Sequence, residues 1–349
     1  MEIGVFTFAD LAAGTTAAQR IPELIEEIRL ADEVGLDVFG IGEHHHPAFG
    51  APAPPVLLAA AAGQTSRIRL TSAVTVLSGD DPVRVFEQFA ALDLASHGRA
   101  EIMAGRGAFL DTFRLFGHDL AAYDALFDEK LRLLLQLRED EPVTWSGQFR
   151  PPLKNELLLP RPVQSPLPVW VAVGGSPDSV IRAASLGLPM ALGTIGGTAR
   201  QFAPLAELYR QAAARYEQAP QALSVTVHGF VAETTQRARE IYYTADADLM
   251  NLAGADRGIH GVTAEHIAAR DVPGGMYTVG SPGEVAERLL YHHEMFGHQR
   301  TMLQLMVGSI SHRDAMRAIE LLGTEVAPMV RDEVARREAT ATAPVQVEL

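Results

Sequence analysis

Eight short, strongly apolar runs alternate along the chain with longer segments of helical periodicity. The runs cover residues 3–8, 38–42, 68–74, 100–104, 169–173, 189–193, 224–232 and 301–306. Strands buried on both faces of a parallel sheet have this continuous apolar character, and their alternation with helices is typical of repeated βα units. Because eight parallel strands close into a barrel filled by side chains, the sequence predicts an α/β fold, a (β/α)8 TIM barrel.

Two connections are longer than a minimal βα unit needs. Residues 140–168 follow the helix after the fourth predicted strand, and residues 233–300 separate the seventh strand from the eighth. We expect both to be insertions that cover the C-terminal mouth of the barrel. No linker divides the chain, so residues 1–337 are expected to form one domain, followed by a disordered, Ala- and Thr-rich tail at 338–349.

Composition and charge argue against several classes of function. The formal net charge is −14 and no stripe of Lys and Arg counters it, so binding to nucleic acid or to a membrane surface is not expected. The chain has no Cys, which excludes disulfides, thiolate metal sites and cysteine nucleophiles. Residues 1–10 do not resemble a signal peptide and no apolar run reaches membrane-spanning length, so a cytoplasmic enzyme is expected.

The most prominent polar cluster follows the second predicted strand. Glu43, His44, His45 and His46 lie at its C-terminal end, where barrel enzymes carry catalytic residues. Neighbouring side chains of an extended segment point to opposite sides, so only alternate members can face one site while the others pack or meet solvent. Imidazoles in this position are suited to proton transfer near neutral pH. Metal binding is the rival interpretation, but the other strand ends offer too few ligands, so no metal is expected.

Two further strand ends are suited to an anion. Arg106 lies between two glycines directly after the fourth predicted strand, which places a permanent cation at the mouth. The turn after the fifth strand contains Gly174, Gly175 and Ser176 and leads into a helix, whose first N–H groups and dipole favour negative charge. Together these features predict a site for a phosphate monoester.

The sixth predicted strand also ends in glycines. Gly196 and Gly197 are expected to widen the approach to the same phosphate site. The alternative to a phosphate site is that the helix after Ser176 is an ordinary capped helix and that Arg106 forms an ion pair at the surface.

Motifs throughout the chain follow the order and nearly the spacing of the bacterial luciferase-like flavin monooxygenases, which the chain resembles over almost its whole length. The matching motifs are Glu43-His44-His45, Thr71-Ser72-Ala73-Val74, Pro82-Val83-Arg84, Gly98-Arg99, Gly105-Arg106-Gly107, Val169-Trp170-Val171-Ala172 and Gly280-Ser281-Pro282. The resemblance implies a TIM barrel that binds FMN.

The resemblance also implies where FMN would bind. Its phosphate would be held by Arg106 and by backbone amides near Gly175 and Ser176. The isoalloxazine would lie over the barrel mouth near Ala73 and Val74, and the resemblance predicts that a non-proline cis peptide joins these two residues.

Catalytic roles and partners follow from the same resemblance. His44 matches the family's catalytic histidine, and His45 is expected to support it. Reduced FMN would come from a separate flavin reductase and react with oxygen and a small organic substrate in an apolar pocket that excludes water. A homodimer formed through helices beside the early strands is also implied. Luciferase has a thiol where this chain has Gly105, so light emission is not implied.

Three alternative functions stay open at this point. They are an F420-dependent oxidoreductase that transfers hydride without oxygen, a flavin-binding protein without turnover, and a metal-dependent barrel. The substrate pocket is expected to draw on the insertions and on side chains that ordinary packing explains equally well. The candidates are Phe6, Phe8, His46, Phe109, His260, Met276 and Tyr277.

Overall fold

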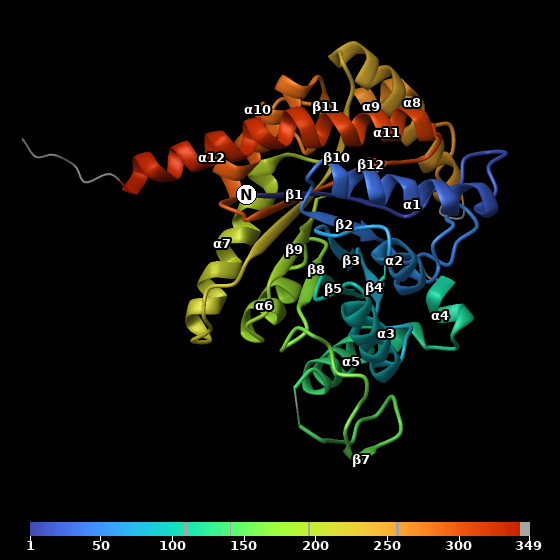
Figure 1. Cartoon of the computed structure of the whole chain (residues 1–349), viewed down its shortest axis with the longest axis vertical. Coiled ribbons are helices and arrows are strands. Elements are labelled where there is room, and N and C mark those ends of the chain that lie inside the picture. Colours follow the sequence, from blue (N-terminus) through green and yellow to red (C-terminus); the bar gives the residue numbers. More distant parts are fainter. Residues whose placement is uncertain (108–110, 140, 195, 256–257, 343–349) are drawn as a thin grey trace, which may run out of the picture.

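The computed structural model describes residues 1–107, 111–139, 141–194, 196–255 and 258–342. Eight parallel strands form a closed barrel with helices around it (Figure 1). In order around the barrel, the strands are β1 (Glu2–Thr7), β2 (Val38–Ile41), β3 (Arg69–Ser72), β5 (Ala100–Gly105), β8 (Val169–Val173), β9 (Met190–Gly193), β10 (Leu223–Val231) and β12 (Arg300–Met306). Pairing of β12 with both β10 and β1 closes the ring, which confirms the predicted (β/α)8 fold.

The helices of the outer layer begin where the sequence supplies caps. Thr16 and Gln19 form a capping box at the first helix, and Asp81 accepts a hydrogen bond from the Val83 N–H just after Pro82 starts the third. The longer helices are α1 (Ala17–Glu33), α2 (Pro54–Ala62), α3 (Pro82–Ala95), α5 (Tyr123–Leu137), α6 (Pro177–Ser185), α7 (Ala199–Arg215), α8 (Thr235–Ala253), α10 (Pro282–Phe296), α11 (His312–Leu321) and α12 (Ala327–Thr342). Short helices are α4 (Asp111–Leu115) and α9 (Ala264–Ala268).

Charged side chains fill the N-terminal end of the barrel. Arg300, at the start of β12, donates to both carboxylate oxygens of Glu101 at 2.7 and 3.1 Å and to Glu2 at 2.7 Å. Its guanidinium also lies over the Trp170 ring, 4.4 Å from the ring centroid. Buried charges are tolerated when they are paired, so this end of the barrel is closed by satisfied groups.

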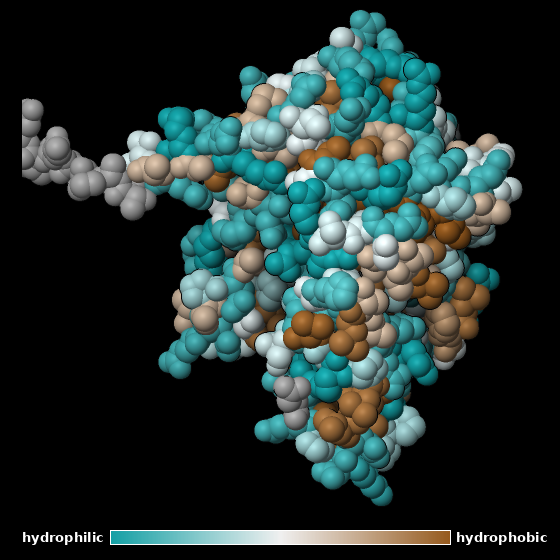
Figure 2. All heavy atoms as spheres, viewed as in Figure 1, coloured by the Kyte–Doolittle hydropathy of each residue, from teal (hydrophilic) through white to brown (hydrophobic). Residues whose placement is uncertain are grey.

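The first insertion differs from the expectation that it covers the mouth. It contains an antiparallel hairpin of β6 (Val143–Trp145) and β7 (Leu153–Glu156), which packs outside α5: the Gln148 and Phe149 N–H groups donate to Glu129 at 2.7 and 2.9 Å. Arg150, beside the hairpin turn, donates to Asp81 at the start of α3 at 3.1 Å, so the insertion lies along the outside of α3 and α5. Figure 1 shows β7 at the edge of the molecule, and Figure 2 shows apolar surface in that region.

The second insertion reaches the mouth, as expected. It contains α8, α9, a further strand β11 (Tyr277–Gly280) and α10. The first half of β10 pairs with β9, and its second half, from His228 to Val231, pairs with β11. β10 is longer than β9, so its upper half extends beyond that neighbour and would be an open edge without β11.

The C-terminal helix α12 continues to Thr342, through the first five residues of the segment predicted as a disordered tail. Residues 343–349 lie outside the described residues. Among the helices that the structure describes, none has both the length and the apolar character needed to cross a lipid bilayer.

Candidate active site

A cavity of about 890 Å³ opens at the C-terminal ends of the barrel strands. Its walls come from all eight barrel strands or the loops after them, together with α8 and β11, and we call it the mouth cavity. Its volume lies within the range of roughly 300 to 1,000 Å³ that is common for cofactor and ligand sites. Its apolar lining includes Phe6, Phe8, Phe49, Val74, Met103, Ala172, Val173, Ala191, Leu249, Met250 and Ile259.

Most of the site residues predicted from sequence lie in the wall of this cavity. Those that line it are His44, Ala73, Val74, Arg106, Gly174, Gly196 and Gly197. His45, Gly175 and Ser176 are adjacent in the chain but are not part of the lining. Gly175, with φ of +110°, and Ser176 form the turn that leads from Gly174 into α6. The structure therefore brings strand ends that are far apart in sequence to one cavity.

The His44 ring is held between two aromatic rings. It makes an edge contact with Phe8 at 4.4 Å between centroids and stacks on Phe49 at 4.6 Å with a 30° angle between planes. Such contacts restrict the orientation of the imidazole. His44 therefore lines the mouth cavity with its ring held between Phe8 and Phe49.

His45 contacts a carboxylate and does not face the cavity. Its Nε2 lies 2.9 Å from Glu43 Oε1, while Glu43 Oε2 accepts a hydrogen bond of 2.8 Å from the Val76 N–H. The Glu43 N–H in turn donates to the Val74 carbonyl at 3.0 Å. Glu43 thereby ties the segment after β3 to the segment after β2. Sequence reasoning noted Glu43 in the polar cluster but did not identify this clamp.

The segment held by Glu43 contains a non-proline cis peptide between Ala73 and Val74, which confirms the prediction from resemblance. Gly105 packs directly against it: a Cβ at Gly105 would lie 2.6 Å from Val74 Cγ2. A cysteine at this position would force Val74 to move. The glycine that replaces the thiol of luciferase therefore fits the close packing of this wall.

Arg106 is positioned by two neighbours from the start of α5. Its guanidinium lies 5.0 Å from the centroid of the Tyr123 ring and forms an ion pair with Asp124. The Tyr123 hydroxyl donates to the Gly107 carbonyl at 2.8 Å, and burial raises its pKa while Arg106 acts in the opposite direction. Asp124 is largely exposed, so an anion in the cavity would compete with a solvent-screened partner for Arg106.

Two glycines of the wall leave backbone accessible from the cavity. A Cβ built on Gly174 or Gly196 would meet no atom within 4 Å. Because both residues line the mouth cavity, the space beside their backbone is available to a ligand.

A hydrogen-bonded polar group forms the opposite wall. His228 Nδ1 lies 3.1 Å from the Tyr242 hydroxyl, and the Tyr277 hydroxyl donates to Asp246 at 2.9 Å. Burial lowers the pKa of His228, and burial together with the Asp246 charge raises the pKa of Tyr277. Both groups are therefore neutral near pH 7. Sequence reasoning missed the His228 side because no motif marks it.

The side chains predicted to line a substrate pocket divide into three groups. Phe6, Phe8 and Tyr277 line the mouth cavity. His46 and Met276 are buried, and His260 is exposed, but none of these three belongs to its lining. Phe109 lies outside the described residues. Among the described residues, no three His, Asp or Glu side chains are grouped so that they could hold a metal ion.

Comparison with known proteins identifies relatives along the whole chain. Residues 1–299 match the luciferase-like monooxygenase family. An uncharacterised protein of Sinorhizobium fredii is 25% identical over 93% of this chain and 95% of its own length. The N-acetyl-S-alkylcysteine monooxygenase of Bacillus subtilis is 31% identical over 51% of this chain and 52% of its own. The alkanal monooxygenase alpha chain of Photorhabdus luminescens is 30% identical over 55% and 53%, so the chain spans about half of these two enzymes.

Solved structures share the fold. The monooxygenase RslO1 from Streptomyces bottropensis superposes with a TM-score of 0.83 and 27% identity, covering 94% of this chain and 99% of that one. The oxygenating constituent of 3,6-diketocamphane monooxygenase from Pseudomonas putida, in complex with FMN, gives 0.78 and 23% over 95% and 98%. The F420-dependent tetrahydromethanopterin reductase from Methanopyrus kandleri gives 0.72 and 18% over 94% and 99%. With a closed eight-stranded barrel and a family match over residues 1–299, the chain belongs to the luciferase-like monooxygenase family.

Proposed function

We propose that this protein is the oxygenase component of a flavin-dependent monooxygenase. It uses reduced FMN from a separate flavin reductase, together with oxygen, to oxidise a small organic substrate. The observation that carries the proposal is the mouth cavity, where His44, Arg106 and the glycine-lined turns after β8 and β9 surround one apolar space. The diketocamphane enzyme is known in complex with FMN, and the Bacillus subtilis relative is an N-acetyl-S-alkylcysteine monooxygenase.

Two features of the cavity fit FMN. The cation Arg106 and the accessible backbone at Gly174 suit a phosphate, since both offer positive charge or space close to N–H groups. The wall formed by Ala73 and Val74, with apolar side chains around it, suits the flat face of an aromatic ring system. FMN therefore matches the residues in size, charge and polarity.

Reduced FMN, when bound, would supply the electrons that activate oxygen. Arg106 and the glycine turns would bind and orient the phosphate, and Glu43 would hold the Ala73–Val74 segment in place through Val76. The apolar walls would exclude water from the reacting atoms. His44, restrained by Phe8 and Phe49, would give or take a proton at a ring nitrogen.

The second candidate is an F420-dependent oxidoreductase. An F420-dependent glucose-6-phosphate dehydrogenase from Amycolatopsis mediterranei is 29% identical over 44% of this chain and 48% of its own. Such an enzyme would use the same barrel but would transfer hydride without oxygen. A flavin-binding protein without turnover is a third outcome of the test below.

The test is anaerobic titration of the purified protein with reduced FMN and, separately, with reduced F420, followed by mixing with oxygenated buffer. We expect reduced FMN to bind saturably, and the absorbance of oxidised FMN to return with a delay that free FMN does not show. His44→Gln should retain FMN binding and change the duration of that delay. Tight F420 binding without reaction with oxygen would assign the protein to hydride transfer. Binding of FMN with no change in its oxygen reaction would indicate a protein without turnover.

A homodimer and a cytoplasmic location belong to the same proposal. The dimer follows from the resemblance to this family, and the location is the expectation drawn from the sequence. Light scattering of the eluting protein at several concentrations would test the dimer, for which a constant mass of one chain would be the contrary result.

A further inference from the structure

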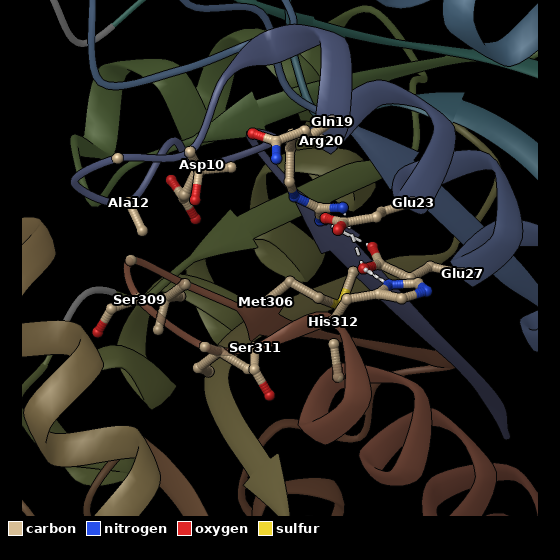
Figure 3. Close-up of a pocket in the computed structure, with 16 residues that line it drawn as sticks. Asp10, Ala12, Gln19, Arg20, Glu23, Glu27, Met306, Ser309, Ser311 and His312 are labelled. Carbon is tan, nitrogen blue, oxygen red and sulfur yellow. Dashed lines mark hydrogen bonds and ion pairs between the residues drawn. The ribbon is translucent and has the colours of Figure 1, made fainter.

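A second, smaller cavity lies beside the mouth cavity and is separate from it. It has a volume of about 320 Å³ and lies between the loop after β1, the loop after β12 and the first turns of α1 and α11 (Figure 3). We call it the side pocket, and its lining includes Asp10, Arg20, Glu27, Met306 and His312. The residues that line the two cavities do not overlap. Its occupant is therefore not the flavin of the proposed function.

The basic side chains of the side pocket already have acidic partners. Arg20 donates to both oxygens of Glu27 at 3.0 and 2.7 Å. His312 lies between two carboxylates, with Nδ1 3.1 Å from Glu27 and Nε2 3.1 Å from Glu26. Figure 3 shows Arg20, Glu27 and His312 joined on one side of the pocket. Little positive charge is left there to attract an anion.

Asp10 has no such partner. Asp10 is 6% exposed and lines the pocket, and no donor meets hydrogen-bond geometry at either carboxylate oxygen, although the Gly308 N–H and Arg20 act on it from nearby. Figure 3 shows it on the side of the pocket opposite the Arg20–Glu27 pair. An ionised carboxylate that is buried without a hydrogen-bond donor is strongly disfavoured. The Asp10 carboxyl is therefore expected to ionise only when a group that donates hydrogen bonds and carries positive charge lies beside it.

The charged groups around Asp10 come from three helices. Arg20, Glu23 and Glu27 lie on α1, His312 begins α11, and the charge of Asp246 on α8 also acts on Asp10. Burial raises the pKa of Asp10 to about 8, while Arg20 and the Gly308 N–H act in the lowering direction and Asp246 in the raising one. Asp10 is thus mainly protonated at pH 7 and can release its proton when a cation arrives.

We propose that the side pocket binds a small organic cation, a primary alkylammonium group, which donates to the Asp10 carboxylate. The apolar side chains of Met306, Ile310 and Ala315 in the same pocket offer contacts for a short alkyl chain. A metal ion is a poorer match, because the described residues provide no group of three metal-ligating side chains. The volume suits a molecule of a few carbon atoms.

The probe for this site is n-butylammonium, with n-butanol as the neutral molecule of nearly the same shape. Isothermal titration calorimetry of the full chain should show saturable binding of the ammonium ion and at least tenfold weaker binding of the alcohol. Affinity should rise roughly tenfold per pH unit below about pH 8, because the ionised fraction of Asp10 rises by that factor. Binding at pH 7 should release close to one proton, measured from the heat in buffers of different ionisation enthalpy.

Three variants distinguish binding at Asp10 from a general effect of the protein's negative charge. Asp10→Asn should lower n-butylammonium affinity more than tenfold and remove the pH dependence. Ala12→Leu, at a residue that lines the pocket, should weaken binding by occupying the space while Asp10 remains. Asp332→Asn, which removes the same charge at an exposed position on α12, should leave affinity within twofold. Equal binding of n-butanol, unchanged binding by Asp10→Asn, or no saturable binding at pH 8 would overturn the proposal.

Discussion

Replacing Glu43 by Ala should destabilise the fold by about 2 to 4 kcal/mol. The Val76 N–H, in a residue that is 2% exposed, would lose Glu43 Oε2 as its acceptor, and a buried donor without a partner costs roughly 1 to 3 kcal/mol. His45 would also lose the carboxylate 2.9 Å from its Nε2, an interaction worth roughly 1 kcal/mol between largely buried groups. Glu43→Gln keeps an oxygen for Val76, so it should cost less than half as much.

Urea unfolding at pH 7, followed by the fluorescence of Trp145 and Trp170, measures this difference. The slope of the free energy of unfolding against urea should stay unchanged while the midpoint falls. Glu87→Ala, which removes a carboxylate paired with Arg84 at the surface, is the control and should change stability by less than about 0.5 kcal/mol. The reasoning is refuted if Glu43→Ala lies within about 0.5 kcal/mol of the parent protein, or if Gln is as damaging as Ala.

Three further predictions concern charge. Arg106→Ala should weaken the binding of reduced FMN by about 2 kcal/mol or more, whereas Asp124→Asn should strengthen this binding a few-fold by removing a carboxylate that competes for Arg106. Both affinities are measured by anaerobic titration. Equal affinity of the parent protein and the two variants would contradict the assignment of Arg106 to the phosphate. Hydrogen bonding to Glu27 raises the pKa of His312 in the folded protein. The interaction therefore stabilises the fold fully below pH 6.5, the pKa of the unfolded chain, and this stabilisation is lost as pH rises through the higher pKa of the folded protein. In urea unfolding, His312→Gln should cost more stability at pH 5.5 than at pH 8.5. Burial lowers the pKa of His298 well below 6.5, so the unfolded chain takes up a proton that the folded chain does not; thermal stability should fall below about pH 6.5, and a flat profile down to pH 5 would oppose this.

The barrel could be predicted because its strands are encoded locally. Each of the eight apolar runs overlaps a barrel strand, since burial on both faces requires continuous apolar sequence. β11 could not be predicted in this way. It has four residues within a long insertion, and its role depends on the length by which β10 exceeds β9.

The site was predictable on one side only. His44, Arg106 and the cis peptide after Ala73 lie in short motifs at strand ends, so the sequence marks them. The opposite wall joins His228 to Tyr242 through side chains on different elements, and that pairing exists only once α8 has packed on the barrel. The path of residues 140–168 could not be predicted, because it depends on contacts of the hairpin with Glu129 and Asp81 that no sequence pattern marks.

The ion network at the N-terminal end of the barrel has a consequence for the order of folding during synthesis. Arg300 belongs to the last barrel strand, yet it neutralises Glu101 of β5 and Glu2 of β1, which leave the ribosome much earlier. Until β12 emerges, Glu101 lacks this partner and β1 has an unpaired edge facing the position that β12 will take. The nascent chain must therefore remain an open, partly paired sheet for most of its translation, and ring closure falls to a single late strand that brings both hydrogen-bond partners and counter-charge.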